Sequence, residues 1–119
     1  MVIGEGGRYI DEADATAHVA GYAVMNDVSE RDYQLNRSCT WDKGKRYQNG
    51  NTATMVYQVP LLISYLSRFM SLQPGDVIST GTPSGVGVGH ELPTFLRAGQ
   101  TISLGVQGLG VQTQRTVPA

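Results

Sequence analysis

The sequence predicts a mainly β domain of the α+β class, with one long helix and a few short helical turns. Three observations indicate this class. The chain has 15 glycines, which mark tight turns and bulges. Only one stretch repeats large apolar residues at helical spacing, and the carboxy-terminal part consists of short strand patterns separated by turn residues. With 119 residues, 40% of them hydrophobic, and only two phenylalanines, we expect a single domain with a modest core.

The amino-terminal part is predicted to hold a short helix and then a buried strand. Residues 11–17 begin with acidic side chains and are rich in alanine, which favours a short helix. Residues 18–28 alternate apolar and small side chains, as a buried strand does, and end at the polar pair Asn26 and Asp27. Ser29 can cap a helical turn directly after this strand. The strand is therefore expected to deliver a polar end to a short turn.

A polar tract and the clearest helix follow. Residues 36–51 are polar and have no lasting period, which is typical of a loop. Pro60 then suits the first turn of a helix, which we expect to end near Ser71. Its apolar stripe favours core packing or a subunit contact over a cofactor site. The stripe consists of Leu61, Leu62, Tyr65, Leu66, Phe69 and Met70.

The carboxy-terminal half is predicted to be mainly β. Pro-Gly and Gly-rich positions alternate there with short runs of β-branched residues. The expected elements are a turn at Pro74 and Gly75, a strand over residues 76–80, a glycine-rich loop to Gly89, a turn at residues 97–100, and strands over residues 101–106 and 111–117.

Charge and composition narrow the classes of function. Nine Lys and Arg against ten Asp and Glu leave a net charge of -1, so no basic surplus favours nucleic acid or an anionic membrane. No apolar run approaches the ~20 residues that cross a bilayer, and no leader pattern is present. We therefore expect a cytoplasmic protein that binds a small metabolite. Cys39 is the single cysteine, which excludes a disulfide within the chain and a thiolate zinc site.

Three segments carry candidate site residues, each with a purely structural explanation beside it. Asp27 could ligate a hard cation such as Mg²⁺, or it could simply end a strand. Lys43 or Lys45 could hold negative charge on a substrate oxygen, or could be solvated loop lysines. Spacing alone favours the structural explanation for both. Residues 79–87 could bind a carboxylate through hydroxyl and backbone N–H donors, or could be a plain glycine-rich connection, and spacing does not decide between these. A nucleotide site is disfavoured there, because no Gly-Lys-Ser/Thr ending follows.

Taken together, the blocks GYAVMNDVSERDYQ, WDKGK, NGNTATM, LLISYLSRFMSLQPGDVISTGTPSGVG and QGLG resemble consecutive blocks of the fumarylacetoacetate hydrolase family. The order matches nearly throughout, and residues 61–87 are the most specific part. The resemblance is closest to bacterial members labelled 2-hydroxyhepta-2,4-diene-1,7-dioate isomerase or 2-oxo acid hydratase. It implies a mixed β-roll, a homodimer, and Mg²⁺, sometimes Mn²⁺ or Ca²⁺, that chelates a 2-oxo or 1,3-dioxo acid and stabilises an enolate.

The resemblance also assigns roles to residues that match family motifs. A cation and a lysine together can hold the negative charge that develops on a substrate oxygen. The implied site residues are Asp27 for the metal, Arg31, Gln34 and Lys45 for catalysis, and Gly81 and Thr82 for binding the substrate's carboxylate.

The chain departs from the family pattern in two places. Members carry a Glu-x-Glu metal pair just before the V-I-G that here is Val2-Ile3-Gly4, and both glutamates are absent from this sequence. Members also place several dozen residues between the G-K motif and the N-G block, whereas Lys45 here runs almost directly into Asn49. We therefore expect a deletion junction near residues 45–47, and Lys45 fits either side of it. Losing two of three carboxylates should weaken metal binding severely.

Three hypotheses follow. The first is an enzyme that hydrolyses, decarboxylates or isomerises a small 2-oxo or acyl-ketone acid through a metal-stabilised enolate. The second is a shortened, non-catalytic remnant that persists as a folded or oligomeric scaffold. The third is a site that a second chain completes.

Overall fold

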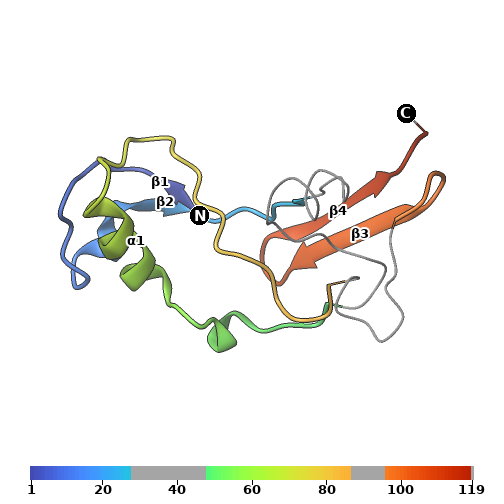
Figure 1. Cartoon of the computed structure of the whole chain (residues 1–119), viewed down its shortest axis with the longest axis horizontal. Helices are drawn as coiled ribbons and strands as arrows, with labels where there is room; N and C mark the ends of the chain where they lie inside the picture. Colours follow the sequence, from blue (N-terminus) through green and yellow to red (C-terminus); the bar gives the residue numbers. More distant parts are fainter. Residues whose placement is uncertain (28–47, 87–95, 119) are drawn as a thin grey trace. The chain divides into compact units, whose positions relative to one another are not determined.

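The computed structural model describes residues 1–27, 48–86 and 96–118, and the chain divides into two compact units. The first unit comprises Met1–Ala23 and Thr52–Thr82, and the second comprises the described parts of Val24–Asn51 and Pro83–Ala119. The expectation of a single domain stays a prediction. In chain order (Figure 1), the first unit contains β1 (Val2–Ile3), η1 (Ala15–His18), β2 (Val19–Gly21), η3 (Thr52–Thr54) and α1 (Val59–Ser67), and the second contains β3 (Thr101–Val106) and β4 (Gly110–Arg115).

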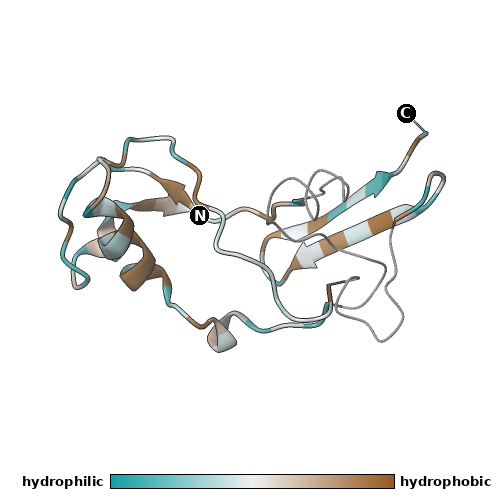
Figure 2. Ribbon diagram, in the orientation of Figure 1, coloured by the Kyte–Doolittle hydropathy of each residue, from teal (hydrophilic) through white to brown (hydrophobic). Residues whose placement is uncertain are grey.

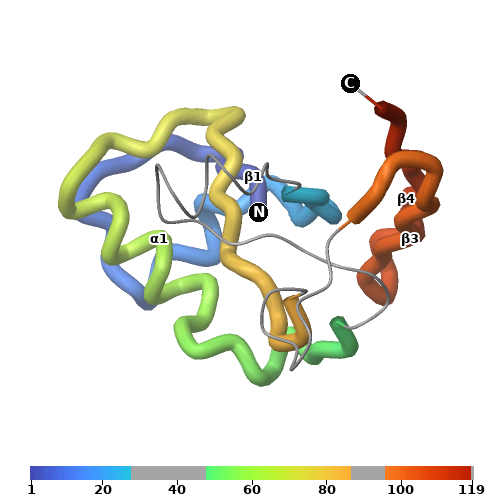
Figure 3. The backbone as a smooth tube through the Cα atoms, turned by 45° about the vertical axis from the view of Figure 1, so that its right-hand side comes forward, coloured from blue at the N-terminus to red at the C-terminus, as the bar shows by residue number. Residues whose placement is uncertain are grey.

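Strand β1 is the centre of the backbone pairing in the first unit. On one side it pairs antiparallel with β2, with Ala20 as an extra residue in the ladder. On the other side Val2 bridges Val77, and the amide of Ile3 donates to the carbonyl oxygen of Asp76 at 2.9 Å. Figure 3 shows the chain returning beside β1 after α1. The amino-terminal strand therefore joins two segments that are far apart in the sequence.

The first unit corrects two strand predictions. The buried strand predicted over residues 18–28 is the three-residue β2, and the side chain of Ala20 within it is exposed. The strand predicted over residues 76–80 is reduced to a single bridge at Val77, although the turn predicted before it is present. Both segments pair with β1, which has only two residues and so offers few backbone groups to its neighbours.

The short helix predicted over residues 11–17 is present only in part. The structure has a 3-10 helix, η1, that begins at Ala15 and contains no acidic residue in its first turn. Asp14 occupies its N-cap position without a side-chain cap hydrogen bond. The predicted contribution of acidic side chains to this helix start was therefore wrong. Such 3-10 helices are short by nature, because their hydrogen-bond geometry is poorer than that of an α-helix.

Helix α1 has nine residues and ends at Ser67, so the prediction of one long helix reaching about Ser71 was wrong. Beyond Ser67, the amides of Arg68 and Phe69 donate to carbonyl oxygens three residues back, at 3.2 and 3.0 Å. Such tightening of the last turn is common at helix ends. Leu72 is then buried in the core, 2% exposed, and pairs with the amino-terminal segment. The burial of Leu72 turns the chain away from the helix axis.

The apolar stripe predicted for this helix forms only part of its packed face, where Leu62 and Leu66 lie partly buried against the core. Ile63, Ser64 and Ser67 are buried, whereas Tyr65 is 55% and Phe69 66% exposed. The two exposed rings contact each other, with centroids 5.1 Å apart. Ser67 can occupy the buried face because the segment packed against it donates backbone hydrogen bonds to the hydroxyl and the carbonyl oxygen of Ser67. Core packing was therefore the wrong prediction for Tyr65 and Phe69, and a subunit contact stays a prediction.

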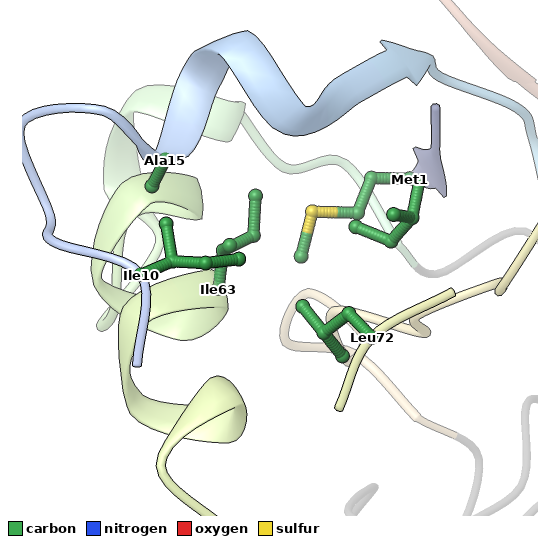
Figure 4. Packing of buried hydrophobic residues seen from close by; sticks show 6 residues of the cluster. Met1, Ile10, Ala15, Ile63 and Leu72 are labelled. Carbon is green, nitrogen blue, oxygen red and sulfur yellow. The ribbon is translucent and has the colours of Figure 1, made fainter. Parts of the chain in front are cut away.

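The core of the first unit is modest, as predicted. Its members come from β1, the loop before η1, η1 itself, α1 and the segment after α1, and the side chains labelled in Figure 4 point toward one another. These contacts tie the amino-terminal residues to a helix that follows more than forty positions later. The buried apolar residues are Met1, Ile3, Ile10, Ala15, Ile63 and Leu72.

The hairpin of the second unit was predicted correctly. Strands β3 and β4 pair antiparallel, and Figure 2 shows strongly apolar residues alternating with residues of intermediate hydropathy along β3. Gly108 and Gly110 at its loop have φ angles of 84° and 81°, the left-handed region that favours glycine. The turn predicted at residues 97–100 is also present. Both ends of the second strand differ slightly, because β4 runs from Gly110 to Arg115 and was predicted over residues 111–117.

The predicted fold class is confirmed in part. The described residues contain two two-stranded sheets, one short α-helix and short 3-10 helices, a mixture of β and α elements without the expected long helix. None of the helices in the described ranges is both long and apolar enough to cross a membrane. The expected cytoplasmic location stays a prediction.

Candidate functional site

Asp27, the predicted metal ligand, ends an irregular segment that follows β2. The strand expected to deliver it stops at Gly21, and residues 22–27 have no regular secondary structure. The Asp27 side chain is exposed, and no other described residue bonds to its carboxylate. An exposed carboxylate is accessible to a cation, but exposure also keeps it well hydrated, so one such group binds a cation weakly.

A pair of glutamines on β4 holds the backbone just before Asp27. The side-chain amide of Gln112 donates to the carbonyl oxygen of Val24 at 3.0 Å, and Gln114 donates to the Gln112 side-chain oxygen at 3.0 Å. The side-chain amide of Asn26 in turn donates to Gln114. This glutamine pair was not predicted from the sequence. Two amides two positions apart on a strand share one face, and that spacing was a signal that could have identified them.

The described residues do not by themselves form a metal cage. In the ranges 1–27, 48–86 and 96–118, no three His, Cys, Asp or Glu side chains lie close enough together to hold an ion. Asp27 is the predicted ligand among them, and Mg²⁺ usually combines one or two carboxylates with retained waters and substrate oxygens. The described residues therefore supply at most one predicted ligand to a bound cation, and any other protein ligands would come from outside them.

Gly81 and Thr82, the predicted substrate-binding residues, lie in an exposed loop without regular secondary structure. Gly81 has a φ of 90° and Gly85 a φ of 98°, so both adopt the left-handed backbone conformation that favours glycine. A methyl group at Gly81 would meet no atom within 4 Å. The backbone conformation, and not crowding, is therefore what requires glycine at position 81. We call residues 81–85 the 81–85 loop.

A second segment contacts the 81–85 loop at Pro83. The side-chain amide of Gln48 donates to the carbonyl oxygen of Pro83 at 2.9 Å, across 35 positions of sequence. Gly50 lies against the Pro83 ring, since a methyl group at Gly50 would lie 2.5 Å from the Pro83 Cβ. The structure thus brings together the NGNTATM and TGTPSG blocks. Neither Gln48 nor Gly50 was predicted from the sequence as a site residue, because residue spacing does not reveal a contact between distant segments.

The other three predicted site residues, Arg31, Gln34 and Lys45, fall in residues 28–47 and so lie outside the described part of the chain. Their catalytic roles stay predictions.

Comparison with known proteins identifies the family. The sequence matches the profile described as the C-terminal region of fumarylacetoacetate (FAA) hydrolase over residues 1–47 and 38–117, which together span nearly the whole chain. The chain belongs to the fumarylacetoacetate hydrolase family. A protein of Burkholderia cenocepacia (strain HI2424), provisionally named as a hydrolase, is 48% identical over 150 aligned positions that cover 98% of this chain and 53% of the relative. The chain therefore spans about half the length of the curated relatives it matches.

Solved structures of family members share the fold. Fumarylacetoacetate hydrolase from Exiguobacterium antarcticum is 30% identical with a TM-score of 0.88, covering 99% of this chain and 54% of that one. The structure of 5-carboxymethyl-2-hydroxymuconate delta-isomerase from Mycobacterium smegmatis is 30% identical with a TM-score of 0.80, and the match covers 98% of this chain and 55% of that one. Fumarylpyruvate hydrolase from Pseudomonas aeruginosa, solved in complex with Mn²⁺ and pyruvate, is 27% identical with a TM-score of 0.75. That match covers 98% of this chain and 62% of the other. The fumarylacetoacetate hydrolase fold expected from the sequence is thus supported by structural similarity.

The alignment with the Burkholderia relative contains more positions than this chain has residues, 150 against 119. That relative therefore carries residues within the matched region that have no counterpart here. The family profile likewise matches in two pieces that overlap between residues 38 and 47. Both findings are what an internal deletion produces, and the position of the junction near residues 45–47 stays a prediction.

Proposed function

We propose that this chain takes part in metal-dependent hydrolysis, decarboxylation or isomerisation of a small 2-oxo or acyl-ketone acid. The observation that carries the proposal is the family match across both pieces of the chain, which includes the loop with Gly81 and Thr82. The Pseudomonas relative, crystallised with Mn²⁺ and pyruvate, supports the choice of a divalent cation and a 2-oxo acid.

Thr82 and the adjacent backbone would bind the carboxylate of the substrate. A threonine hydroxyl is a hydrogen-bond donor, and bonds to a charged acceptor are stronger than those between neutral groups. The left-handed backbone at Gly81 carries no side chain, which leaves room for an anion beside its peptide N–H. This loop would therefore orient the substrate by its carboxylate, without contacting the carbonyl group that reacts.

Asp27 would contribute one oxygen ligand to the cation, with Mg²⁺ as the first choice and Mn²⁺ or Ca²⁺ as alternatives. When bound, such a cation supplies positive charge for the substrate oxygen on which negative charge develops. Arg31, Gln34 and Lys45 would provide the remaining polar groups near the substrate. Since Asp27 is the one predicted metal ligand among the described residues, we propose that a second copy of the chain, in a homodimer, helps to complete the coordination of the cation.

Calorimetric titration with MnCl₂ tests the metal assignment. We expect Asp27→Asn to weaken Mn²⁺ binding by at least about tenfold, because removing a direct ligand costs no less than removing an outer partner. Asp14→Asn is the matched control: Asp14 is also exposed, and its side chain makes no cap hydrogen bond to η1. Turnover of oxaloacetate or an acylpyruvate with Mg²⁺ then tests the reaction. If the unmodified chain shows neither heat nor turnover, the proposal fails.

The second candidate function, a folded scaffold without catalysis, is favoured by one observation. Large rings such as Tyr65 and Phe69 are exposed, where a partner chain could cover them. Under this alternative, Mg²⁺ leaves the melting temperature unchanged in both the unmodified chain and Asp27→Asn. A ligand that binds only the folded state raises the melting temperature, so a shift that disappears in Asp27→Asn would exclude the scaffold.

A further inference from the structure

Pro83 is held by two contacts with residues that lie outside the 81–85 loop. The first is polar, because the Gln48 side-chain amide donates to the Pro83 carbonyl oxygen at 2.9 Å. The second is steric, because the absence of a side chain at Gly50 lets the Pro83 ring approach to a distance that any Cβ would block. Both Gln48 and Gly50 belong to a segment that precedes the loop by more than thirty positions. Pro83 is therefore held by a long-range tether and by close packing.

The loop needs such an anchor because of its own sequence. Gly81 and Gly85 flank Pro83, and glycine loses more conformational freedom on ordering than any other residue. Proline fixes its own φ near −65° and has no N–H to donate, so it cannot anchor the loop by donating a backbone hydrogen bond. Its carbonyl oxygen is the group that a neighbour can hold, and Gln48 holds it. Thr82 is covalently joined to this fixed residue.

We propose that Gln48 and Gly50 are positioning residues for substrate binding. They hold the 81–85 loop so that Thr82 is already oriented for the carboxylate of a 2-oxo acid. The inference rests on the proposed function, since it takes Thr82 as the carboxylate-binding residue. Neither residue touches the substrate. They act by lowering the cost of ordering the loop when the acid binds, which is the general benefit of preorganisation.

Gln48→Met tests the polar contact. Methionine has a similar length and no charge, but its side chain has no hydrogen-bond donor. We expect pyruvate, titrated in the presence of Mn²⁺, to bind about threefold to tenfold more weakly, the range that one net hydrogen bond provides. Gln58→Met is the matched control, because Gln58 also donates to a backbone carbonyl oxygen, that of Met55, but far from the 81–85 loop in sequence. This control should bind pyruvate as tightly as the unmodified chain.

Gly50→Ala tests the steric contact. The added methyl group would lie 2.5 Å from the Pro83 Cβ, so the loop must shift, and we expect pyruvate binding to weaken by at least about tenfold. Gly21→Ala makes the same chemical change where no atom lies within 4 Å of the new methyl group. Proton–nitrogen spectra without ligand provide a readout independent of affinity. The amide signals of Gly81 and Thr82 should move in Gly50→Ala and Gln48→Met, and should stay in place in both controls.

The outcomes separate this inference from the function on which it rests. If the unmodified chain binds pyruvate and both Gln48→Met and Gly50→Ala bind it equally well, the positioning role is wrong and the proposed function stands. If a control variant loses as much affinity as its partner, a general loss of structure explains the effect and the inference is overturned. If the unmodified chain binds no pyruvate with Mn²⁺ present, the proposed function fails and this inference fails with it.

Discussion

The two units of the chain are stabilised by different kinds of interaction. All six buried apolar residues of the described part lie in the first unit, where a strand, a helix and two loops meet around Ile63. No described residue of the second unit is buried, and its β3–β4 hairpin relies on backbone pairing and on side-chain hydrogen bonds such as that between Ser103 and Thr113. An isolated two-stranded hairpin is marginally stable in water. Among the described residues, stabilisation by apolar burial therefore belongs to the first unit.

This difference bears on where the candidate site residues lie. Asp27 belongs to the second unit, whose described residues include no buried one, while Gly81 and Thr82 are the last residues of the first. Regions with few buried apolar contacts open at low free-energy cost, and binding sites are commonly built from them. Among the described residues, the glutamine pair on β4 provides polar contacts to the segment just before Asp27. Substitutions in the two units should reveal this contrast.

The largest expected effect comes from Ile63→Ala, which removes a side chain that is 0% exposed. Loss of buried methyl groups and the resulting cavity typically cost about 2–5 kcal/mol of unfolding free energy. Val111→Ala in β4 is the matched control, because Val111 is 75% exposed and such changes usually stay within about 0.5 kcal/mol. Urea denaturation followed by circular dichroism measures both. Equal losses in the two variants would show that burial does not distinguish the units.

A smaller effect is expected from Ser67→Ala. The Ser67 hydroxyl accepts a hydrogen bond from the amide of Ile10 at 2.9 Å and donates to the carbonyl oxygen of Ser64 at 2.8 Å. Because the residue is fully buried, its loss leaves the Ile10 amide without this partner, at a cost of about 1–3 kcal/mol. Ser103→Ala removes an exposed hydroxyl of the hairpin and should cost less. A loss for Ser103→Ala that matches Ser67→Ala in the same denaturation experiment would contradict the contrast.

Elements that depend on neighbouring residues were predictable from the sequence, and elements that depend on distant ones were not. The hairpin and its glycine loop follow from strand pattern and turn chemistry, and both were predicted with nearly correct ends. The predicted length of α1 was wrong because the chain leaves the helix after Ser67 and pairs at Leu72 with Gly7, a tertiary contact that local sequence does not indicate. The predicted buried face of α1 was only partly right, because Ser64 and Ser67 are buried on it and hydrophobic periodicity cannot indicate buried hydroxyl groups.

The candidate site shows the same limit. Asp27, Gly81 and Thr82 were identified by resemblance to family motifs, while spacing alone favoured a structural explanation for Asp27. The contacts made beside them were not foreseen, because Gln48 reaches across 35 positions to Pro83 and Gln112 across 88 to Val24. Such contacts are properties of the fold and leave no local pattern in the sequence.

The smallest expected effect, and the sharpest test of the contrast, comes from Gln112→Leu. Leucine keeps an apolar stem on β4 but cannot donate to the carbonyl oxygen of Val24, so we expect a loss of about 0.5–1.5 kcal/mol confined to the second unit. Hydrogen exchange should accelerate at Asn26 and Asp27, with amides of α1 unchanged. Gln107→Leu, at the exposed hairpin turn, should leave all of these rates in place. Faster exchange in α1 would mean that the glutamine pair stabilises the packed unit as well, and that the two units are coupled more strongly than their different interactions suggest.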